Sequence, residues 1–331
     1  MVTATPEVIL GLGRAFMESR VLLTAVELDI FTPLAHRAMT AEELAGALGA
    51  DLRGTTTLLD AVTAIGLLEK EDGRYRCASD AAELLSRDSA RSVVPMLRHS
   101  VALWRRWSEL TEVVRRGTPA PRPAEPEQRE EDRAAFIGAM HTVASRMAAE
   151  VVAAIGAGNA TRLLDIGGAS GTYTQAFLEA SPALEATLFD LPPVIEMARR
   201  RLSTTGVIER VHFVTGDFYQ DELPPGHDLA LLSAIIHQNS AEQNVELYRK
   251  VFRALEPGGR LVIRDHVMND DHTRPRRGAI FAINMLVGTA GGGTYSFKEI
   301  QAGLEAAGFE AVRLLQADEP MSGLVEGFRR R

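Results

Sequence analysis

Short apolar runs alternate with amphipathic stretches from residue 161 to the end of the chain. The stretches at 172–180, 193–204 and 241–255 carry apolar residues at helical spacing. This alternation predicts an open α/β sheet that is mostly parallel, with helices on both faces. The last two runs are close in sequence, so we expect an antiparallel final pair. The seven expected strands are TRLLDI, EATLFD, VHFVTGD, HDLALLSAII, RLVIRDHV, FEAVRLLQA and SGLVEGFR.

The first 116 residues show a different, mainly helical pattern. Residues 16–35 predict one mostly buried helix, and Thr40 with Glu43 forms a capping box that opens a short second helix. A third helix follows, and residues 66–78 predict two short strands around an Asp-Gly turn. Helix, helix and hairpin in this order are typical of a winged helix.

A winged helix often binds DNA, which would make this protein a DNA-binding regulator. The helix that would enter the groove, RGTTTLLDAVTAIG, has one arginine and one aspartate, and the whole chain has a formal net charge of −8. Because phosphate backbones attract basic surfaces, we favour a dimerisation or structural role over nucleic-acid binding.

Composition sets further expectations about where the protein works. With Cys77 as the single cysteine, the chain cannot form an intrachain disulfide, which fits the reducing cytoplasm. The first residues lack the pattern of a signal peptide, and we find no run of about 18 uncharged apolar residues that could span a membrane. We therefore expect a cytoplasmic protein without a membrane partner.

A proline-rich segment at 117–131 interrupts both patterns. Its prolines and charges predict a loop. A helical stretch precedes it at 93–116, and a long helix is expected at roughly 132–156. We therefore divide the chain into a helical domain at 1–116, the loop, and a larger domain at 132–331.

Residues suited to binding a nucleoside follow three of the expected strands. Ligands of such sheets bind beyond the carboxyl ends of the strands, near the point where the strand order reverses. A glycine-rich turn lets the backbone approach a ligand, an aspartate can accept both hydroxyls of a ribose, and a phenylalanine can stack on a purine. The candidates are Asp165, Gly167, Gly168 and Gly171 at the end of the first strand, Asp190 at the end of the second, and Gly216, Asp217 and Phe218 at the end of the third.

Taken one at a time, these residues also have ordinary explanations. The glycines could form a tight turn, Asp190 could cap a helix, and Asp217 could be a solvated turn residue. Their order along successive strand ends favours a nucleoside ligand instead. Ala169 and Ser170 interrupt the dinucleotide fingerprint G-x-G-x-x-G, and the chain has no phosphate-loop motif. The Gly216-Asp217 strand end favours S-adenosylmethionine.

With these motifs, the chain resembles the plant-type small-molecule O-methyltransferases, a family that includes caffeate and N-acetylserotonin O-methyltransferases and bacterial tailoring enzymes. The segments LLDIGGASG, FDLP, VTGDFY, SAIIHQNS and LEPGGRLVI occur in family order. The resemblance implies a Rossmann-like class I methyltransferase sheet preceded by a winged-helix dimerisation domain. It also implies S-adenosyl-L-methionine as methyl donor, S-adenosyl-L-homocysteine as product, a small-molecule acceptor, no metal, and a homodimer in which the N-terminal helices of one subunit help close the other's pocket.

The resemblance makes His237 the general base that removes a proton from the acceptor hydroxyl. Neutral imidazole, whose unperturbed pKa is about 6.5, suits a phenol or an enolic hydroxyl at neutral pH. Asp265 matches the carboxylate that orients this histidine, and Leu191 and Ser233 match cofactor-side positions. His237 could instead cap a helix or be a simple buried histidine at a strand end.

Three departures from the family leave the chemistry open. Gln238 replaces the acidic residue after the histidine, Ser233 replaces a lysine, and Thr294 stands where a second orienting carboxylate is usual. The same fold and cofactor could therefore serve C- or N-methylation, or a tailoring reaction without methyl transfer. His266 follows Asp265 in an expected strand, so we expect it to face the opposite side of the sheet.

Candidates for the acceptor pocket come from two helical segments, FIGAM with the histidine after it, and NMLVGTAGGG. The resemblance places both on the acceptor side. The methionines in them could equally be packed in the core. The five candidates are Phe136, Met140, His141, Met285 and Thr289.

Overall fold

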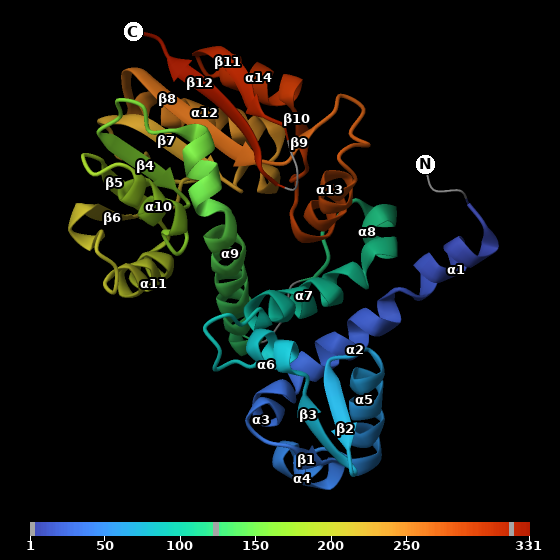
Figure 1. Cartoon of the computed structure of the whole chain (residues 1–331). Coiled ribbons are helices and arrows are strands. Elements are labelled where there is room, and N and C mark those ends of the chain that lie inside the picture. Colours follow the sequence, from blue (N-terminus) through green and yellow to red (C-terminus); the bar gives the residue numbers. More distant parts are fainter. Residues whose placement is uncertain (1–3, 122–125, 318–320) are drawn as a thin grey trace. The chain divides into compact units, whose positions relative to one another are not determined.

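The computed structural model describes residues 4–121, 126–317 and 321–331. The chain forms two compact units (Figure 1). Unit 1 comprises residues 1–105 and 123–142, and unit 2 comprises residues 106–122 and 143–331.

Unit 1 contains the winged-helix pattern that the sequence predicts. Strands β2 (Leu68–Glu71) and β3 (Arg74–Cys77) are antiparallel and meet at a turn, and β1 (Met39–Thr40) pairs with the other edge of β3. The expected capping box is present at the start of α4, with both of its hydrogen bonds. The helices that begin in this unit are α1 (Pro6–Arg14), α2 (Phe16–Glu27), α3 (Phe31–His36), α4 (Ala41–Leu48), α5 (Leu52–Ala64), α6 (Ser79–Leu85), α7 (Val94–Trp107) and α9 (Pro126–Ile155).

Two predictions about the helical segments are wrong. The single helix expected at 16–35 is two helices, because the chain turns at Asp29, whose φ is 55°. The loop expected at 117–131 ends earlier, because α9 begins at Pro126. Proline fits the first turn of a helix, where its missing N–H has no intrahelical partner, and the glutamates and glutamine that follow favour helix. Residues 122–125 lie outside the described residues.

Unit 2 is built on a seven-stranded sheet in the order β11-β12-β8-β7-β4-β5-β6. Strands β4 to β8 are parallel, whereas β12 runs antiparallel to both β8 and β11. The antiparallel final pair expected from the sequence is therefore confirmed, and the carboxyl ends of the parallel strands lie along one edge of the sheet. The strands are β4 (Arg162–Ile166), β5 (Glu185–Asp190), β6 (Val211–Thr215), β7 (His227–Ser233), β8 (Leu255–Asp265), β11 (Phe309–Gln316) and β12 (Gly323–Arg329).

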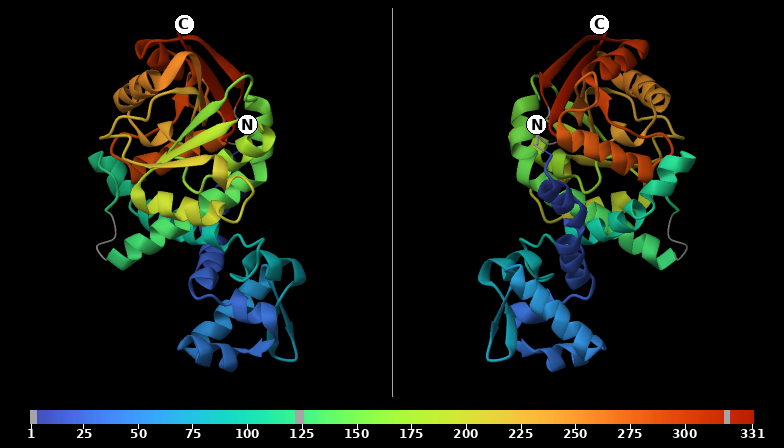
Figure 2. Two further views of the ribbon diagram at one scale, coloured as in Figure 1. Left: turned by 90° about the vertical axis from the view of Figure 1, so that its left-hand side faces the viewer. Right: turned by 90° about the vertical axis from the view of Figure 1, so that its right-hand side faces the viewer.

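Helices cover both faces of this sheet (Figure 2). Leu164 and Leu232 pack in one apolar core with α12 and α14, whereas Leu163 and Leu231 pack in the other core with the end of α9, α10 and α11. Side chains alternate along a strand, so strands such as β4 and β7 contribute to both cores. The other elements of unit 2 are α8 (Leu110–Arg116), α10 (Thr172–Ala180), α11 (Pro192–Leu202), α12 (Ala241–Ala254), α13 (Arg276–Gly288), α14 (Phe297–Ala306), the short strands β9 (Val267–Met268) and β10 (Tyr295–Ser296), and the 3₁₀ turns η1 (Ile208–Arg210) and η2 (Ile236–Gln238).

Within the described parts of the chain, no helix combines the length and the apolar character needed to cross a membrane.

Candidate active site

The predicted cofactor residues gather at the carboxyl edge of the sheet in unit 2. The glycine-rich turn follows β4, Asp190 is the last residue of β5, and Gly216 comes directly after β6. Ser233 ends β7, and Asp265 ends β8. The strand order β8-β7-β4-β5-β6 brings these five strand ends side by side.

The turn between β4 and α10 needs glycine both for its backbone conformation and for space. Gly167 has a φ of 67°, and a Cβ there would lie 2.6 Å from Cδ1 of Ile235. Gly171 has a φ of 74°, and its Cβ would lie 2.8 Å from side-chain atoms of Leu188 and Leu202. This closely packed turn is followed by the start of α10. The backbone N–H groups there lack intrahelical partners and can bind a polar ligand.

Asp165 lies beneath this turn. It is 2% exposed and accepts a hydrogen bond of 2.6 Å from Oγ1 of Thr174. A Cβ on Gly168 would lie 2.8 Å from the Asp165 carboxylate, so this glycine allows the backbone to cover it. Burial raises the pKa of Asp165 to about 6, and the charge of Asp190 acts in the same direction. Asp165 therefore supports the turn from below.

Asp190 joins the turn to the end of β5. Its Oδ2 accepts a hydrogen bond of 2.9 Å from the N–H of Ala169, and its Oδ1 accepts one of 2.7 Å from the N–H of Leu191. Burial raises the pKa of Asp190. Each carboxylate oxygen has a second lone pair, so the side chain can still accept from ligand hydroxyls. Leu191 is 46% exposed beside it.

The residues after β6 form a tight turn. Gly216 leaves no room for a side chain, because a Cβ would lie 2.5 Å from a phenylalanine ring carbon of β5. The carboxylate of Asp217 accepts hydrogen bonds of 2.9 Å from the N–H of Tyr219 and from Nε2 of Gln220. Phe218 packs against the Tyr219 ring, with centroids 4.6 Å apart. Asp217 thus shapes its own turn and retains lone pairs for a ligand amine.

His237 and Asp265 form a buried pair beyond the ends of β7 and β8. Nδ1 of His237 lies 2.9 Å from both Oδ1 and Oδ2 of Asp265, and the two side chains are 12% and 1% exposed. Burial acts to raise the pKa of Asp265, but His237 and a hydrogen bond from the N–H of His266 together hold this pKa below its ordinary value. Nε2 of His237 makes no hydrogen bond with any described residue, so it is the nitrogen left for a ligand.

Asn239 holds the turn that carries His237, and the sequence did not point to it. Its side chain is fully buried; Oδ1 accepts a hydrogen bond of 2.6 Å from the Tyr219 hydroxyl, and Nδ2 donates one of 3.0 Å to Asn244. Its backbone carbonyl accepts from the hydroxyl of Tyr295. In the sequence, a polar residue between an apolar strand and a capped helix looks the same whether it is buried or solvated.

Met285 and Thr289, two of the acceptor candidates, lie at the end of α13. Met285 is 8% exposed, and the Thr289 hydroxyl donates to the Met285 carbonyl at 2.8 Å. The same hydroxyl accepts from the N–H of Gly292, while the N–H of Gly293 donates to the His237 carbonyl, each at 2.8 Å. These residues therefore connect the end of α13 to the His237 turn.

We expected His266 to face the opposite side of the sheet from Asp265, but its ring lies near that of His237. Both imidazole rings pack against Phe281, with centroid distances of 4.8 Å. Strand β8 ends at Asp265, so the alternation of a regular strand does not extend to His266. Thr294, in the place of the second family carboxylate, is buried.

Ser233 lies beside a buried arginine that the sequence-based prediction missed. Ser233 and Arg264 are opposite each other in β7 and β8, and Nη1 of Arg264 donates to Oγ of Ser233 at 3.3 Å. Arg264 is 3% exposed. The signal in the sequence is a single arginine within the apolar run LVIRD.

The other acceptor candidates lie on the part of α9 that belongs to unit 1. Phe136 is 45% exposed, and its ring lies 5.3 Å from that of His99. His141 lines a cavity of about 540 Å³ within unit 1, together with Arg98. Met140 is partly buried. Whether these three contact the acceptor stays a prediction, because His237 is in unit 2.

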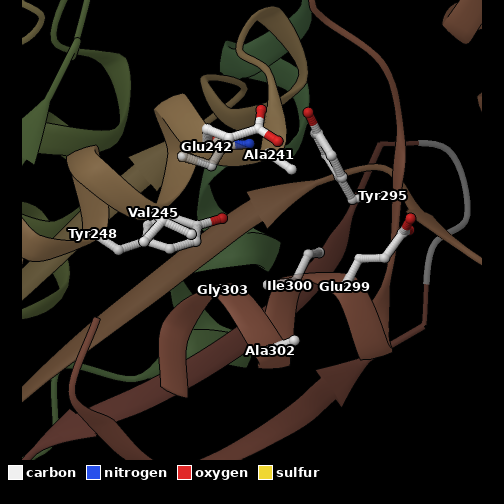
Figure 3. Close-up of a pocket in the computed structure, with 10 residues that line it drawn as sticks. Ala241, Glu242, Val245, Tyr248, Tyr295, Glu299, Ile300, Ala302 and Gly303 are labelled. Atoms are coloured by element: carbon white, nitrogen blue, oxygen red, sulfur yellow. The ribbon is translucent and has the colours of Figure 1, made fainter. Parts of the chain in front are cut away.

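A different hollow of unit 2, with a volume of about 350 Å³, lies between α12 and α14 (Figure 3). Glu242 and Glu299 line it, with the rings of Tyr248 and Tyr295. None of the predicted site residues lines this hollow, so it is separate from the strand-end site. Over the described ranges, no group of histidine, cysteine and acidic residues could hold a metal ion.

Family models and relatives describe the same two-part organisation. An O-methyltransferase domain model matches residues 107–310, and an O-methyltransferase dimerisation domain model matches residues 10–87. A 3-hydroxy-5-methyl-1-naphthoate 3-O-methyltransferase of Streptomyces sahachiroi is 32% identical over 98% of this chain and 95% of that protein. An L-tyrosine C(3)-methyltransferase of Streptomyces lavendulae is 27% identical over 90% of this chain and 85% of that protein.

A solved structure, PigF with SAH, superimposes with a TM-score of 0.88 at 27% identity, over 99% of this chain and all of that one. This structure covers nearly the whole of the chain, and the two domain models match its N-terminal part and most of its C-terminal part. The chain therefore belongs to the family of S-adenosylmethionine-dependent O-methyltransferases that carry a dimerisation domain.

Proposed function

We propose that the protein transfers a methyl group from S-adenosylmethionine to a hydroxyl of a small aromatic or polyketide-like molecule, with His237 as general base. The buried His237–Asp265 pair carries this proposal. It lies at the same sheet edge as the glycine-rich turn, and its Nε2 has no hydrogen-bond partner among the described residues.

The strand-end residues fit an adenosyl sulfonium. Asp190 can accept from the ribose hydroxyls, since each of its oxygens has a free lone pair beside a backbone donor. Asp217 can accept from the adenine amine, and Phe218 can stack on the adenine ring. Gly167 and Gly171 carry no side chains, so the backbone of their turn can lie close to the cofactor.

The acid–base step follows from the geometry of the histidine. S-adenosylmethionine supplies an electrophilic methyl group, so that a carbon–oxygen bond to the acceptor forms as the carbon–sulfur bond breaks. Asp265 accepts a hydrogen bond from Nδ1–H of His237, which leaves the Nε2 lone pair to take the hydroxyl proton. The carboxylate then stabilises the imidazolium that forms, as an ionised partner should.

Two observations support an aromatic acceptor: the apolar side chains near His237, and the substrate for which a relative is named. Phe281 and Met285 both lie on α13, and the ring of Phe281 packs against that of His237 at an interplanar angle of 87°. A flat aromatic ring suits such a surface. The Streptomyces sahachiroi relative is named for a hydroxylated naphthoate, which is a molecule of this kind.

Product analysis tests this function directly. The purified protein is incubated with methyl-labelled S-adenosylmethionine and a panel of hydroxynaphthoates and related phenols. We expect one labelled methyl group per product, on oxygen. Binding of neither S-adenosylmethionine nor S-adenosylhomocysteine in calorimetry would contradict the proposal.

C-methylation is a second candidate. The relative named as an L-tyrosine C(3)-methyltransferase covers most of this chain, and Gln238 and Thr294 depart from the carboxylates usual in the family. With fewer carboxylates around the base, a phenol could react at ring carbon instead of oxygen. Carbon NMR of the labelled product separates the two, because an O-methyl carbon resonates far downfield of an aryl C-methyl carbon.

We also propose that unit 1 mediates a homodimer and does not bind DNA. Helix α1 has no buried residue, and Ile9, Leu10 and Leu12 on it are more than half exposed. Exposed apolar side chains in this number favour a protein interface. The β2–β3 hairpin, which is the wing of this fold, offers little positive charge to a DNA backbone, because its Lys70 pairs with Asp60 at 2.7 Å. Light scattering should give a dimer mass for the chain and a monomer mass for the double variant Ile9→Asp, Leu12→Asp.

A further inference from the structure

We propose that Arg264, together with the hydroxyl of Tyr173, binds the carboxylate at the amino-acid end of S-adenosylmethionine. The inference rests on the proposed function, because it assigns a further part of the same cofactor site.

Arg264 is a buried cation without an anion. It is 3% exposed and forms no ion pair with any residue that the structure describes. Its Nη1 donates to Ser233 and its Nη2 approaches Sδ of Met147, each at 3.3 Å, while its buried Nε has no partner. A charge removed from water is unfavourable unless an opposite charge compensates it. The site is therefore suited to an anion that arrives with a ligand.

The hydroxyl of Tyr173 is a second buried donor in the same place. Tyr173 is 7% exposed, and its hydroxyl lies near Ser233 but makes no hydrogen bond of ordinary geometry with the described part of the chain. The guanidinium carbon of Arg264 lies 5.3 Å from the centre of the Tyr173 ring. Tyr173 is in the first turn of α10, directly after the glycine-rich turn. Two unsatisfied donors beside this turn point to a shared acceptor group.

The strand order indicates which end of the cofactor reaches Arg264. The proposed ribose and adenine residues, Asp190 and Asp217, follow β5 and β6 on one side of β4. Arg264 lies in β8, on the other side of β4 and beyond β7. A sulfonium beside His237 lies between these two groups. Its amino-acid portion then extends toward β7 and β8, where the carboxylate meets the guanidinium.

Arg264 also supplies a charge that the end of β7 lacks. Ser233 occupies the position where the family usually has a lysine, and it pairs directly with Arg264 across the two strands. The positive charge at this edge of the sheet therefore comes from the neighbouring strand. Guanidinium binds carboxylates through paired N–H groups, which suits a fixed position in a buried site.

Arg260 provides a matched control on the same strand and the same face. Its Nη1 donates to the buried carboxylate of Glu326 at 3.2 Å, and its Nη2 donates to the carbonyl of Ile155 at 3.2 Å. Its charge is thus compensated within the protein. Arg260→Met and Arg264→Met remove the same group from one satisfied and one unsatisfied position.

The experiment measures calorimetric dissociation constants of S-adenosylhomocysteine and 5′-methylthioadenosine, which shares the nucleoside and thioether but has no amino acid. We expect Arg264→Met to weaken S-adenosylhomocysteine about 10- to 100-fold, in line with the loss of a charged hydrogen bond, and to leave methylthioadenosine unchanged. Tyr173→Phe should show the same selectivity with a smaller loss. Arg260→Met should change neither constant.

Thermal unfolding without ligand gives a readout independent of binding. Arg264→Met should unfold at a temperature no lower than the wild type, because it removes an uncompensated buried charge, whereas Arg260→Met should unfold earlier. An equal loss for both ligands, or an unchanged constant for S-adenosylhomocysteine, would overturn the inference while the proposed function stands. A wild type that binds neither compound would overturn the proposed function as well.

Discussion

The two ends of the parallel strands in unit 2 differ in whether their polar side chains have hydrogen-bond partners. At the amino ends, His227 uses both ring nitrogens, with Thr187 at 2.9 Å and the Pro224 carbonyl at 3.1 Å. Asp228 accepts from the N–H and hydroxyl of Thr161, both at 2.8 Å. At the carboxyl ends, Nε2 of His237 and Nε of Arg264 have no hydrogen-bond partner among the described residues.

This difference separates polar groups that stabilise the fold from polar groups that await a ligand. A buried donor or acceptor without a partner destabilises a protein, so sites that keep one are good candidates for function. Loss of a group at the amino ends should therefore lower stability. Loss of a group without a partner at the carboxyl ends should lower binding or catalysis and leave stability nearly intact.

The largest expected effect is on catalysis at the carboxyl end. His237→Ala should reduce kcat by about 10²- to 10⁴-fold, the usual contribution of a general base, with the affinity for S-adenosylhomocysteine nearly unchanged. Initial rates and calorimetry measure both quantities. His227→Gln is the control at the opposite end and should keep kcat while it lowers the free energy of unfolding by about 1–3 kcal/mol. Full activity of His237→Ala would remove this histidine from the reaction.

The next effect is on stability at the amino half of β8. Glu326 is fully buried and binds both Arg260 and Arg313. Glu326→Gln should lower the free energy of unfolding by about 3–5 kcal/mol, because it leaves a partly buried arginine without its anion. Urea unfolding at neutral pH measures the change. If the variant were as stable as the wild type but slower in catalysis, the proposed division between the two ends would be wrong.

Asp165 should make the stability depend on pH. Its pKa is raised to about 6, chiefly by burial, so the folded protein favours the neutral carboxyl. This contribution is complete below the ordinary pKa of about 3.9 and is lost as the pH rises through the folded value, a loss on the order of 3 kcal/mol. Asp165→Asn cannot ionise, so the stability of the wild type relative to this variant should fall between about pH 4 and pH 6.

Urea unfolding of both proteins across this range measures that difference. Other carboxyls, such as Asp265 with its lowered pKa, act in the opposite direction and are common to both proteins. A constant stability difference from pH 4 to pH 7 would show that Asp165 titrates normally.

The smallest effect concerns the position of the base. A Cβ on Gly292 would lie 2.5 Å from the His237 carbonyl and from the Thr289 hydroxyl, so Gly292→Ala must shift one of them. We expect a loss in kcat of about tenfold with unchanged cofactor affinity, since small displacements of a catalytic group are costly. Gly206→Ala is the control, because nothing lies within 4 Å of its Cβ. Equal rates for the two variants would mean that the loop does not set the position of His237.

The sequence predicted the elements whose signals are local. The glycine-rich turn and Asp190 follow from short motifs at strand ends, the antiparallel final pair follows from the closeness of the last two apolar runs, and the pairing of His237 with Asp265 follows from the family resemblance. Asp29 and Pro126 were misjudged because a left-handed residue and a helix start depend on a few backbone angles. The role of Arg264 could not be foreseen, since the absence of a partner is a property of the folded chain.

Asn239 has a consequence for how the site responds to its ligands. Through its side chain and its carbonyl, it touches the segment after Phe218, the start of α12 and the strand that holds Tyr295. The segments that we propose to hold the adenine and the base thus meet β10 at this one buried residue. A ligand bound at one of these segments should restrict the motion of the others. The methyl donor would then bind more tightly when the acceptor is already bound, and the acceptor more tightly when the donor is bound.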